Sequence, residues 1–249
     1  MGRKVHPIGF RLGYTKKWSS TWYADRDYTA LLAEDIQIRD FVRLFLENPR
    51  QQQQQRRGGR RRGFGAGVSL IQIERQVSQV RVIIHTARPG IVIGRGGGNR
   101  EEIQRRIERQ TGKRTVVDVQ EINQPELDSF LVARNVAEQL ERRVSFRRAM
   151  RMTAERSMRA GAMGIKIMVS GRLGGREMSR TEFQLTGTVP LQTLDADIDY
   201  GFTEARTAYG RIGVKTWIHR GMARVDETEL LGETVSAPGG GGRRPPRRS

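Results

Sequence analysis

The sequence predicts an α+β protein of two domains, and three observations support this prediction. Its 249 residues are enough for two domains that each have a core. Apolar residues recur at helical spacing in some stretches, whereas other stretches alternate or are rich in β-branched residues, as strands are. These patterns break at Asn123-Gln124-Pro125, near the middle of the chain, which indicates a boundary between the two domains.

The N-terminal elements begin with a helix over 28–47, where apolar side chains form one broad stripe that stops before Asn48-Pro49. Glutamine, arginine and glycine then dominate residues 50–66. Because this composition cannot form a core, we interpret the stretch as a low-complexity, mobile insert. Two interpretations remain open for the insert. It makes weak, salt-sensitive contact with RNA, or it is a solvated loop with no dedicated role.

Strands are predicted over 68–77, 80–86 and 115–122, where β-branched residues are frequent. Between the second and the third strand lie Arg88-Pro89-Gly90, a glycine-rich loop and a helix. The predicted order is therefore helix, strand, strand, helix, loop, helix and strand.

The C-terminal half starts with two helices. Apolar residues that recur every four positions predict the first over 126–144, and the second follows over 146–160. The other predicted elements are strands over 164–171 and 178–185, an extended stretch over 189–194, a short helix over 203–209 and a strand over 213–219. Two helices packed on a small, mainly antiparallel sheet give this half an α+β fold.

The glycine-rich loop reads Gly94-Arg95-Gly96-Gly97, with glycine at its first and fourth positions. Glycine lets a backbone approach a bulky ligand because it has no Cβ. Asn99 is predicted to cap the next helix, with Glu102 completing a capping box and Gly112 at the helix end. The loop thus ends at a helix N-terminus, which favours phosphate.

Three interpretations of this loop compete. A dinucleotide fingerprint requires glycine where Asn99 stands, and a P-loop requires a hydroxyl residue where Arg114 follows Lys113, so both fail. A plain surface turn is the neutral interpretation. The third is the RNA-gripping loop of a KH module, which the spacing and the element order resemble. It predicts RNA contacts at Gly94, Arg95, Gly96, Gly97 and Arg100.

The charge of the chain also points to an anionic partner. The formal net charge is +18, from 45 lysines and arginines against 27 acidic residues, and the isoelectric point is near 11.3. Acid-free tracts over 50–62 and 243–248 hold ten arginines, which account for ten of the eighteen surplus charges. The remainder is therefore basic as well, as expected for a chain that binds nucleic acid or an anionic membrane surface.

Residues 1–24 mix basic residues with glycine and aromatic residues and show no clear period. This pattern is typical of an arm that becomes ordered against a partner. The predicted RNA contacts here are Arg3, Lys4, His6, Lys16 and Lys17. A metal ligand is the weaker interpretation of His6, because the three histidines are far apart in the sequence.

Several classes of function are disfavoured. The chain has no cysteine, so disulfides and thiolate sites are excluded. We find no apolar run near ~20 residues and no signal-peptide pattern, and so expect no membrane partner. Asp195, Asp197 and Asp199 would share one face of a strand and suit Mg²⁺, but pairing with basic residues is the favoured interpretation. We predict no catalytic residue, no metal and no cofactor.

Further motifs are Gly2-Arg3-Lys4-Val5-His6-Pro7, the run from His85 to Gly94, Pro125-Glu126-Leu127-Asp128, the run from Gln139 to Met150, Ser170-Gly171-Arg172-Leu173-Gly174-Gly175, the run from Asp195 to Tyr200 and Thr207-Ala208-Tyr209-Gly210. In this order they resemble the family of the bacterial-type third protein of the small ribosomal subunit. The resemblance covers nearly all of 1–221. The insert and the lack of a lysine in the loop depart from the family pattern.

This resemblance implies a domain plan. Residues 1–38 form the arm and the start of the first helix, and 39–123 form a type II KH domain that contains the insert. Residues 124–221 form the C-terminal α+β domain, and 222–249 are a disordered basic tail.

The resemblance also implies a function. The protein is expected to be a structural constituent of the ribosome that binds ribosomal RNA in the head of the small subunit, next to head proteins of the tenth and fourteenth families. It would line the channel where messenger RNA enters, in the cytoplasm or in an organelle with bacterial-type ribosomes. A free KH-type RNA-binding regulator is the alternative.

In the second C-terminal helix, Arg151 follows Arg147 by four positions and Arg148 by three, so one helix face carries all three. They repel one another unless an anion is near, or they form a solvated face on which Glu155 pairs with Arg151. The resemblance implies that these positions guide messenger RNA and help unwind it.

Overall fold

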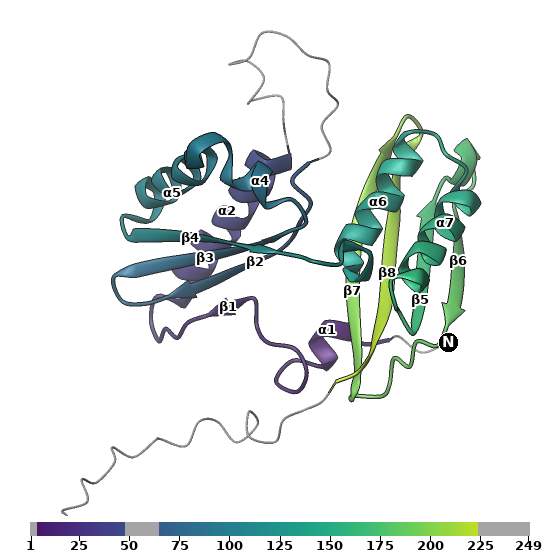
Figure 1. Ribbon diagram of the computed structural model, residues 1–249, viewed down its shortest axis with the longest axis horizontal. Coiled ribbons are helices and arrows are strands. Elements are labelled where there is room, and N and C mark those ends of the chain that lie inside the picture. Colours follow the sequence, from purple (N-terminus) through teal and green to yellow (C-terminus); the bar gives the residue numbers. More distant parts are fainter. Residues whose placement is uncertain (1–3, 48–64, 224–249) are drawn as a thin grey trace, which may run out of the picture.

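The computed structural model describes residues 4–47 and 65–223, which form two domains side by side (Figure 1). Most of the predicted insert, the predicted tail beyond residue 223 and Arg3 lie outside the described residues. Within the described part, no helix has the length and apolar character that a membrane span requires.

The N-terminal domain consists of α2 (Tyr28–Glu47), β2 (Val68–Arg75), β3 (Gln79–Thr86), α4 (Pro89–Ile93), α5 (Gly98–Thr111) and β4 (Arg114–Glu121). Strand β1 (Ser20–Thr21) extends the sheet to the order β1-β2-β3-β4. β2 and β3 are antiparallel, whereas β3 and β4 are parallel. Helices α2 and α5 cover one face of this sheet, where Ile38, Ile103 and Ile107 are fully buried (Figure 1). The predicted order of helices and strands is confirmed.

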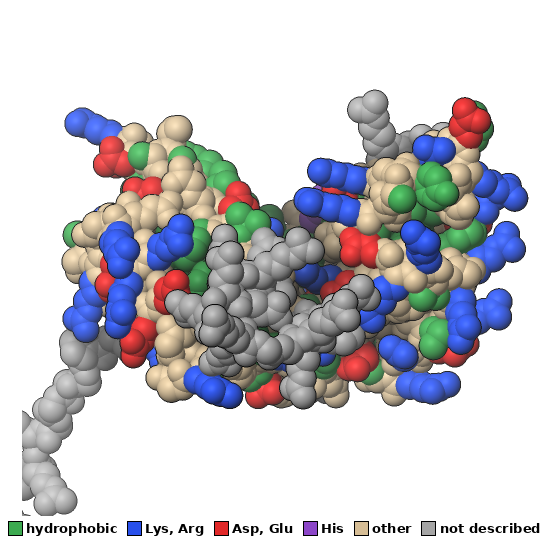
Figure 2. All heavy atoms as spheres, turned by 90° about the horizontal axis from the view of Figure 1, so that it is seen from above, with side chains coloured by type: hydrophobic (Ala, Val, Ile, Leu, Met, Phe, Trp, Pro, Cys, Tyr) green, Lys and Arg blue, Asp and Glu red, His purple; other side chains and the backbone are tan. Residues whose placement is uncertain are grey.

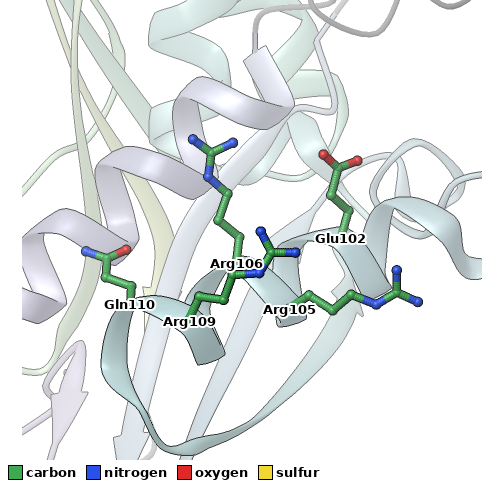
Figure 3. Close-up of a pocket in the computed structure, with 5 residues that line it drawn as sticks. All are labelled: Glu102, Arg105, Arg106, Arg109 and Gln110. Carbon is green, nitrogen blue, oxygen red and sulfur yellow. The ribbon is translucent and has the colours of Figure 1, made fainter.

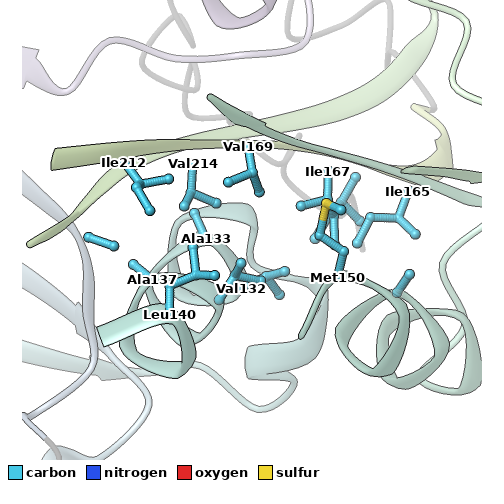
Figure 4. Close-up of a cluster of buried hydrophobic side chains, with 14 of the residues drawn as sticks. Val132, Ala133, Ala137, Leu140, Met150, Ile165, Ile167, Val169, Ile212 and Val214 are labelled. Carbon is cyan, nitrogen blue, oxygen red and sulfur yellow. The ribbon is translucent and has the colours of Figure 1, made fainter. Parts of the chain in front are cut away.

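The C-terminal domain consists of α6 (Ser129–Glu141), α7 (Phe146–Arg159), β5 (Gly164–Gly171), β6 (Arg180–Gly187), β7 (Ala196–Thr207) and β8 (Gly210–Met222). Its sheet is antiparallel throughout, in the order β6-β5-β8-β7. Both helices pack on one face of the sheet. Ile167 and Val169 of β5 meet Val132 of α6 and Met150 of α7 in the core (Figure 4). The prediction of two helices on an antiparallel sheet is confirmed.

Two local predictions in this domain are wrong. The short helix predicted over 203–209 is the end of β7, which pairs with β8 and places Thr203 opposite Val214. Gly210, which suggested a helix end, instead forms the hairpin turn with φ at +119°. The stretch 189–194 is a loop and not an extended strand.

The N-terminal arm is ordered by its own chain. Helix α1 (Pro7–Phe10) lies against β7 (Figure 1). After it, the fully buried guanidinium of Arg11 donates hydrogen bonds to the carbonyl oxygens of Ala196, Leu191 and Thr193, at 2.9, 3.2 and 2.7 Å. The arm therefore does not need an external partner to become ordered, contrary to the prediction.

The last two residues of the predicted insert, Gly65 and Ala66, pack against the N-terminal domain. Ala66 is fully buried, and its carbonyl accepts a hydrogen bond of 2.7 Å from the Thr86 hydroxyl. Gly65 lies beside the backbone of Glu47 at the end of α2. The low-complexity composition obscured these last residues because arginine and glycine surround a single small apolar side chain.

Side chains from both domains meet at the junction. Arg134 of α6 forms an ion pair with Glu47, and the guanidinium of Arg43 lies 5.8 Å from the centre of the Phe130 ring. Asp128 caps α6 through Leu131 and accepts a hydrogen bond from Ser69 of β2. Burial, aided by the nearby charge of Asp199, raises the pKa of the Asp128 carboxyl.

Candidate nucleic-acid interface

The glycine loop is a compact turn that only glycine adopts easily. Helix α4 ends at Ile93, and the next residue, Gly94, has φ at +75°. Arg95–Gly97 form a single 3₁₀ turn in which Gly96 and Gly97 also have positive φ, at +61° and +85°. Side chains at these three positions would be strained, so the glycines are required by the turn itself.

Asn99 has a different role from the predicted one. Helix α5 begins at Gly98 with Gly97 as its cap, and Asn99 instead donates a hydrogen bond of 2.8 Å to the carbonyl of Ile91. The side-chain amide of Asn99 thus links the loop to α4. A Cβ on Gly94 would lie only 2.7 Å from this amide group, so the contact also requires glycine at position 94. α5 has no side-chain cap, and apart from the Gly98 N–H, which donates to the Arg95 carbonyl, the N–H groups of its first turn are available to an anion. The predicted helix end at Gly112 is confirmed by its φ of +64°.

Two arginines give this turn its charge. Arg95 is exposed, and Arg100 is held only loosely, at 3.9 Å from Asp118. Asp118 makes a closer ion pair with Arg81, at 2.7 Å. Both Arg95 and Arg100 can therefore turn toward a phosphate beside the loop.

We predict that replacing Arg95 and Gly96 together by aspartate lowers the affinity of the full chain for single-stranded RNA about tenfold or more. The change places negative charge beside phosphate and adds a side chain at an open positive-φ position. Arg176→Asp, on an exposed loop of the other domain, is the control. Fluorescence anisotropy measures both, and equal affinities in folded proteins would contradict the assignment.

Helix α7 presents its predicted arginines to solvent. Arg147, Arg148 and Arg151 are exposed, whereas Ala149 and Met150 are buried in the core. Within the described residues none of the three forms an ion pair, and the pair of Arg151 with Glu155 that the alternative interpretation requires is not made.

The ring of Phe146, at the start of this helix, lies close to two arginine side chains. The guanidinium groups of Arg147 and Arg180 lie 5.7 and 5.5 Å from the ring centre. Stacking on a ring leaves the edge of a guanidinium open to hydrogen-bond a phosphate.

The predicted contacts in the arm divide into two groups. Lys4 and Lys17 are exposed. Lys16 forms an ion pair of 2.6 Å with Asp197, and His6 accepts a hydrogen bond from the N–H of Gly9 at the start of α1. Lys16 and His6 therefore contribute to the packing of the arm on the C-terminal domain.

The aspartate row forms no metal site. Asp195 accepts a hydrogen bond from Tyr14, Asp197 is paired with Lys16, and Asp199 forms an ion pair of 2.8 Å with Arg220. No cluster of metal-ligating side chains occurs among the residues that the structure describes. The expected pairing with a basic residue is thus found for Asp197 and Asp199, whereas Asp195 meets a tyrosine hydroxyl.

One surface was not predicted as a site. The face of the C-terminal sheet opposite α6 and α7 carries Lys166, whose ammonium lies 5.5 Å from the ring centre of Phe183 and 5.4 Å from that of Trp217. Phe183 is 64% exposed, and Leu185 is exposed beside it on β6, whereas exposed Phe202 lies on β7 at the other edge of the sheet. The alternation of apolar and polar residues along 164–171 indicated an outward face but not its aromatic neighbours.

Together the KH order of elements, the glycine turn before α5 and the basic surface define an RNA-binding protein. Figure 2 shows lysine and arginine side chains over both domains, so the positive charge is not confined to the tracts outside the described residues. A KH domain model matches residues 62–127, and a model described as the C-terminal domain of ribosomal protein S3 matches 136–218.

Relatives extend the match to most of the chain. The small ribosomal subunit protein uS3 of Syntrophomonas wolfei is 51% identical over 238 residues, which cover 96% of this chain and 94% of the relative. That of Natranaerobius thermophilus is 52% identical, covering 92% and 93%. That of Pelotomaculum thermopropionicum is 50% identical, covering 97% and 100%. The chain belongs to the uS3 family of small ribosomal subunit proteins, which are structural and not enzymes.

Proposed function

We propose that this protein binds ribosomal RNA in the head of the small subunit and lines the channel through which messenger RNA enters, in the cytoplasm. Ribosomal RNA contact is supported by the basic surface and by the glycine turn, whose backbone and α5 N-terminus suit phosphate. Exposed Lys4, Lys17, Arg95 and Arg100 add positive charge for further phosphate contacts.

The observation that carries the role at the channel is the arginine face of α7. Arg147, Arg148 and Arg151 are exposed and form no ion pair within the described residues, although like charges this close repel one another. A phosphate backbone that passes over this face relieves the repulsion. Since α7 is packed on the core through Ala149 and Met150, the arginines are held on a rigid element.

The mechanism on this proposal is electrostatic. Arginines hold the phosphates of separated message strands, which lowers the chance that a hairpin closes again ahead of the ribosome. Translocation supplies the pull, so this chain needs no nucleotide hydrolysis.

We predict that Arg147→Ala, Arg148→Ala and Arg151→Ala together slow translation through a hairpin several-fold more than translation of an unstructured message. Subunit assembly should be unaffected, because all three side chains point to solvent. Arg156→Ala with Arg159→Ala, on the exposed last turn of α7, is the matched control. Elongation rates on the two messages, measured in a reconstituted system, test this. Equal slowing on both messages would refute the role.

Neighbouring head proteins of the tenth and fourteenth families are the proposed protein partners. The sheet face around Lys166 supports such an interface, because exposed Phe183 and Leu185 of β6 form an apolar area beside this lysine. Exposed apolar areas of this kind usually mark contact sites.

A further inference from the structure

Helix α5 has a second basic surface that the glycine turn does not use. Its residues at spacings of three and four line a hollow of about 480 Å³ on the helix body: Glu102, Arg105, Arg106, Arg109 and Gln110 (Figure 3). We call this the arginine hollow. Ile103 and Ile107, on an adjoining side of α5, are buried beneath the helix.

Contacts with α2 hold one side of the arginine hollow in place. The guanidinium of Arg106 reaches toward α2 and lies 4.9 Å from the centre of the Phe41 ring (Figure 3). The Gln110 amide donates a hydrogen bond of 2.6 Å to Gln37. Arg106 is therefore positioned before any ligand arrives, which reduces the entropy lost on binding.

The positive charge of the hollow is only partly compensated. Arg105 forms an exposed ion pair of 3.0 Å with Glu101, a weak interaction in water. Within the described residues, Arg106 and Arg109 form no ion pair with a carboxylate. Three guanidinium groups in one hollow, with Glu102 at its edge, suit an anion that has several oxygens, such as a phosphodiester.

The chemistry of the lining also indicates the form of the nucleic acid. Away from the glycine turn, surfaces that bind single strands without sequence preference usually add aromatic rings on which bases stack. No described residue that lines the hollow is aromatic, and the neighbouring ring of Phe41 is covered by Arg106. Phosphates alone are therefore contacted, as in recognition of an RNA duplex by its backbone.

We propose that the arginine hollow binds the backbone of double-stranded RNA, independently of its sequence. This proposal rests on the ribosomal RNA binding proposed above and gives it a second site. The hollow lies about 12–16 Å along α5 from the glycine turn, taking 1.5 Å per residue. The KH domain can thus hold a single strand at the turn and a duplex at the hollow.

The test compares variants of the full chain for binding to a short RNA duplex and to a single strand, between about 50 and 200 mM salt. Arg106→Gln with Arg109→Gln should make the slope of log affinity against log salt shallower by about 2 for the duplex, and lower duplex affinity at least about tenfold. Single-strand affinity should remain within about twofold of the parent. Arg176→Gln with Arg206→Gln, both exposed on the other domain, is the control of equal charge.

A charge-retaining pair, Arg106→Lys with Arg109→Lys, should keep the parent slope, which separates loss of charge from loss of folding. An unchanged duplex slope in a folded glutamine variant would overturn the proposal, as would an equal loss in the control pair. Normal duplex binding with poorer incorporation into small subunits would also overturn it, in favour of an acidic protein neighbour. If the parent itself binds neither RNA, the proposed function fails and not merely the hollow.

Discussion

Replacing Arg11 by methionine is expected to lower the free energy of unfolding by about 3–5 kcal/mol, a large share of the stability of a typical domain. The guanidinium is fully buried and donates to the backbone carbonyls of Pro7, Ala196, Leu191 and Thr193. Methionine fills similar space but donates no hydrogen bond, so these carbonyls are left unsatisfied at about 1–3 kcal/mol for each buried group.

Urea unfolding of the full chain measures this effect. Arg11→Lys should recover only part of the loss, because an ammonium group cannot reproduce the planar fork that reaches Ala196 and Thr193 together. Lys4→Met, at an exposed position of the same arm, is the control and should change stability by no more than about 0.5 kcal/mol. A methionine variant as stable as the parent would show that the arm is not anchored at Arg11.

The second large effect is expected for Asp35→Ala in α2, again about 3–5 kcal/mol. The carboxylate of Asp35 is fully buried and accepts hydrogen bonds of 2.8 Å from Ser20, Trp22 and Arg75. Alanine would remove the buried carboxylate partner of Arg75, which is itself almost fully buried and would keep only its ion pair with Glu34, and a buried charge that loses a partner is costly. Strand β1 would lose one of its ties to α2 as well, although Arg39 of α2 would still donate hydrogen bonds to Ser19 and Ser20.

Asp40→Ala is the matched control for this change, because Asp40 lies on the same helix and is exposed. It should alter the unfolding free energy by less than about 0.5 kcal/mol. The two variants can be compared by thermal and urea unfolding. Equal stabilities would mean that the network around Asp35 contributes little to the N-terminal domain.

The sequence was sufficient for features that depend on local pattern. Periodic apolar residues identified α2, α6 and α7, and β-branched runs identified β2, β3 and β4. The glycine turn was identified by the spacing of Gly94 and Gly97 and by the helix start that follows, and the structure adds that both glycines have positive φ. The arginine face of α7 followed from helical spacing alone.

Features that depend on contacts between distant residues could not be predicted. The sequence does not show whether Arg11, in a basic arm, donates to RNA phosphates or to the carbonyls of a loop about 180 residues away. Phosphate and carbonyl oxygens both accept hydrogen bonds from a guanidinium. Asparagine is a common helix cap, but the amide of Asn99 instead donates a hydrogen bond to the carbonyl of Ile91, which the sequence does not show. Residues 203–209 have helical character locally, yet pairing with β8 decides that they form a strand.

The central claim is that this protein works as an RNA-bound part of the small ribosomal subunit and not as a free KH-type regulator. Sedimentation of the full chain in a sucrose gradient at about 0.1 M salt tests this most directly. The protein is expected to peak with the small subunits. Detection at the top of the gradient, with none in the small-subunit peak, would contradict the account.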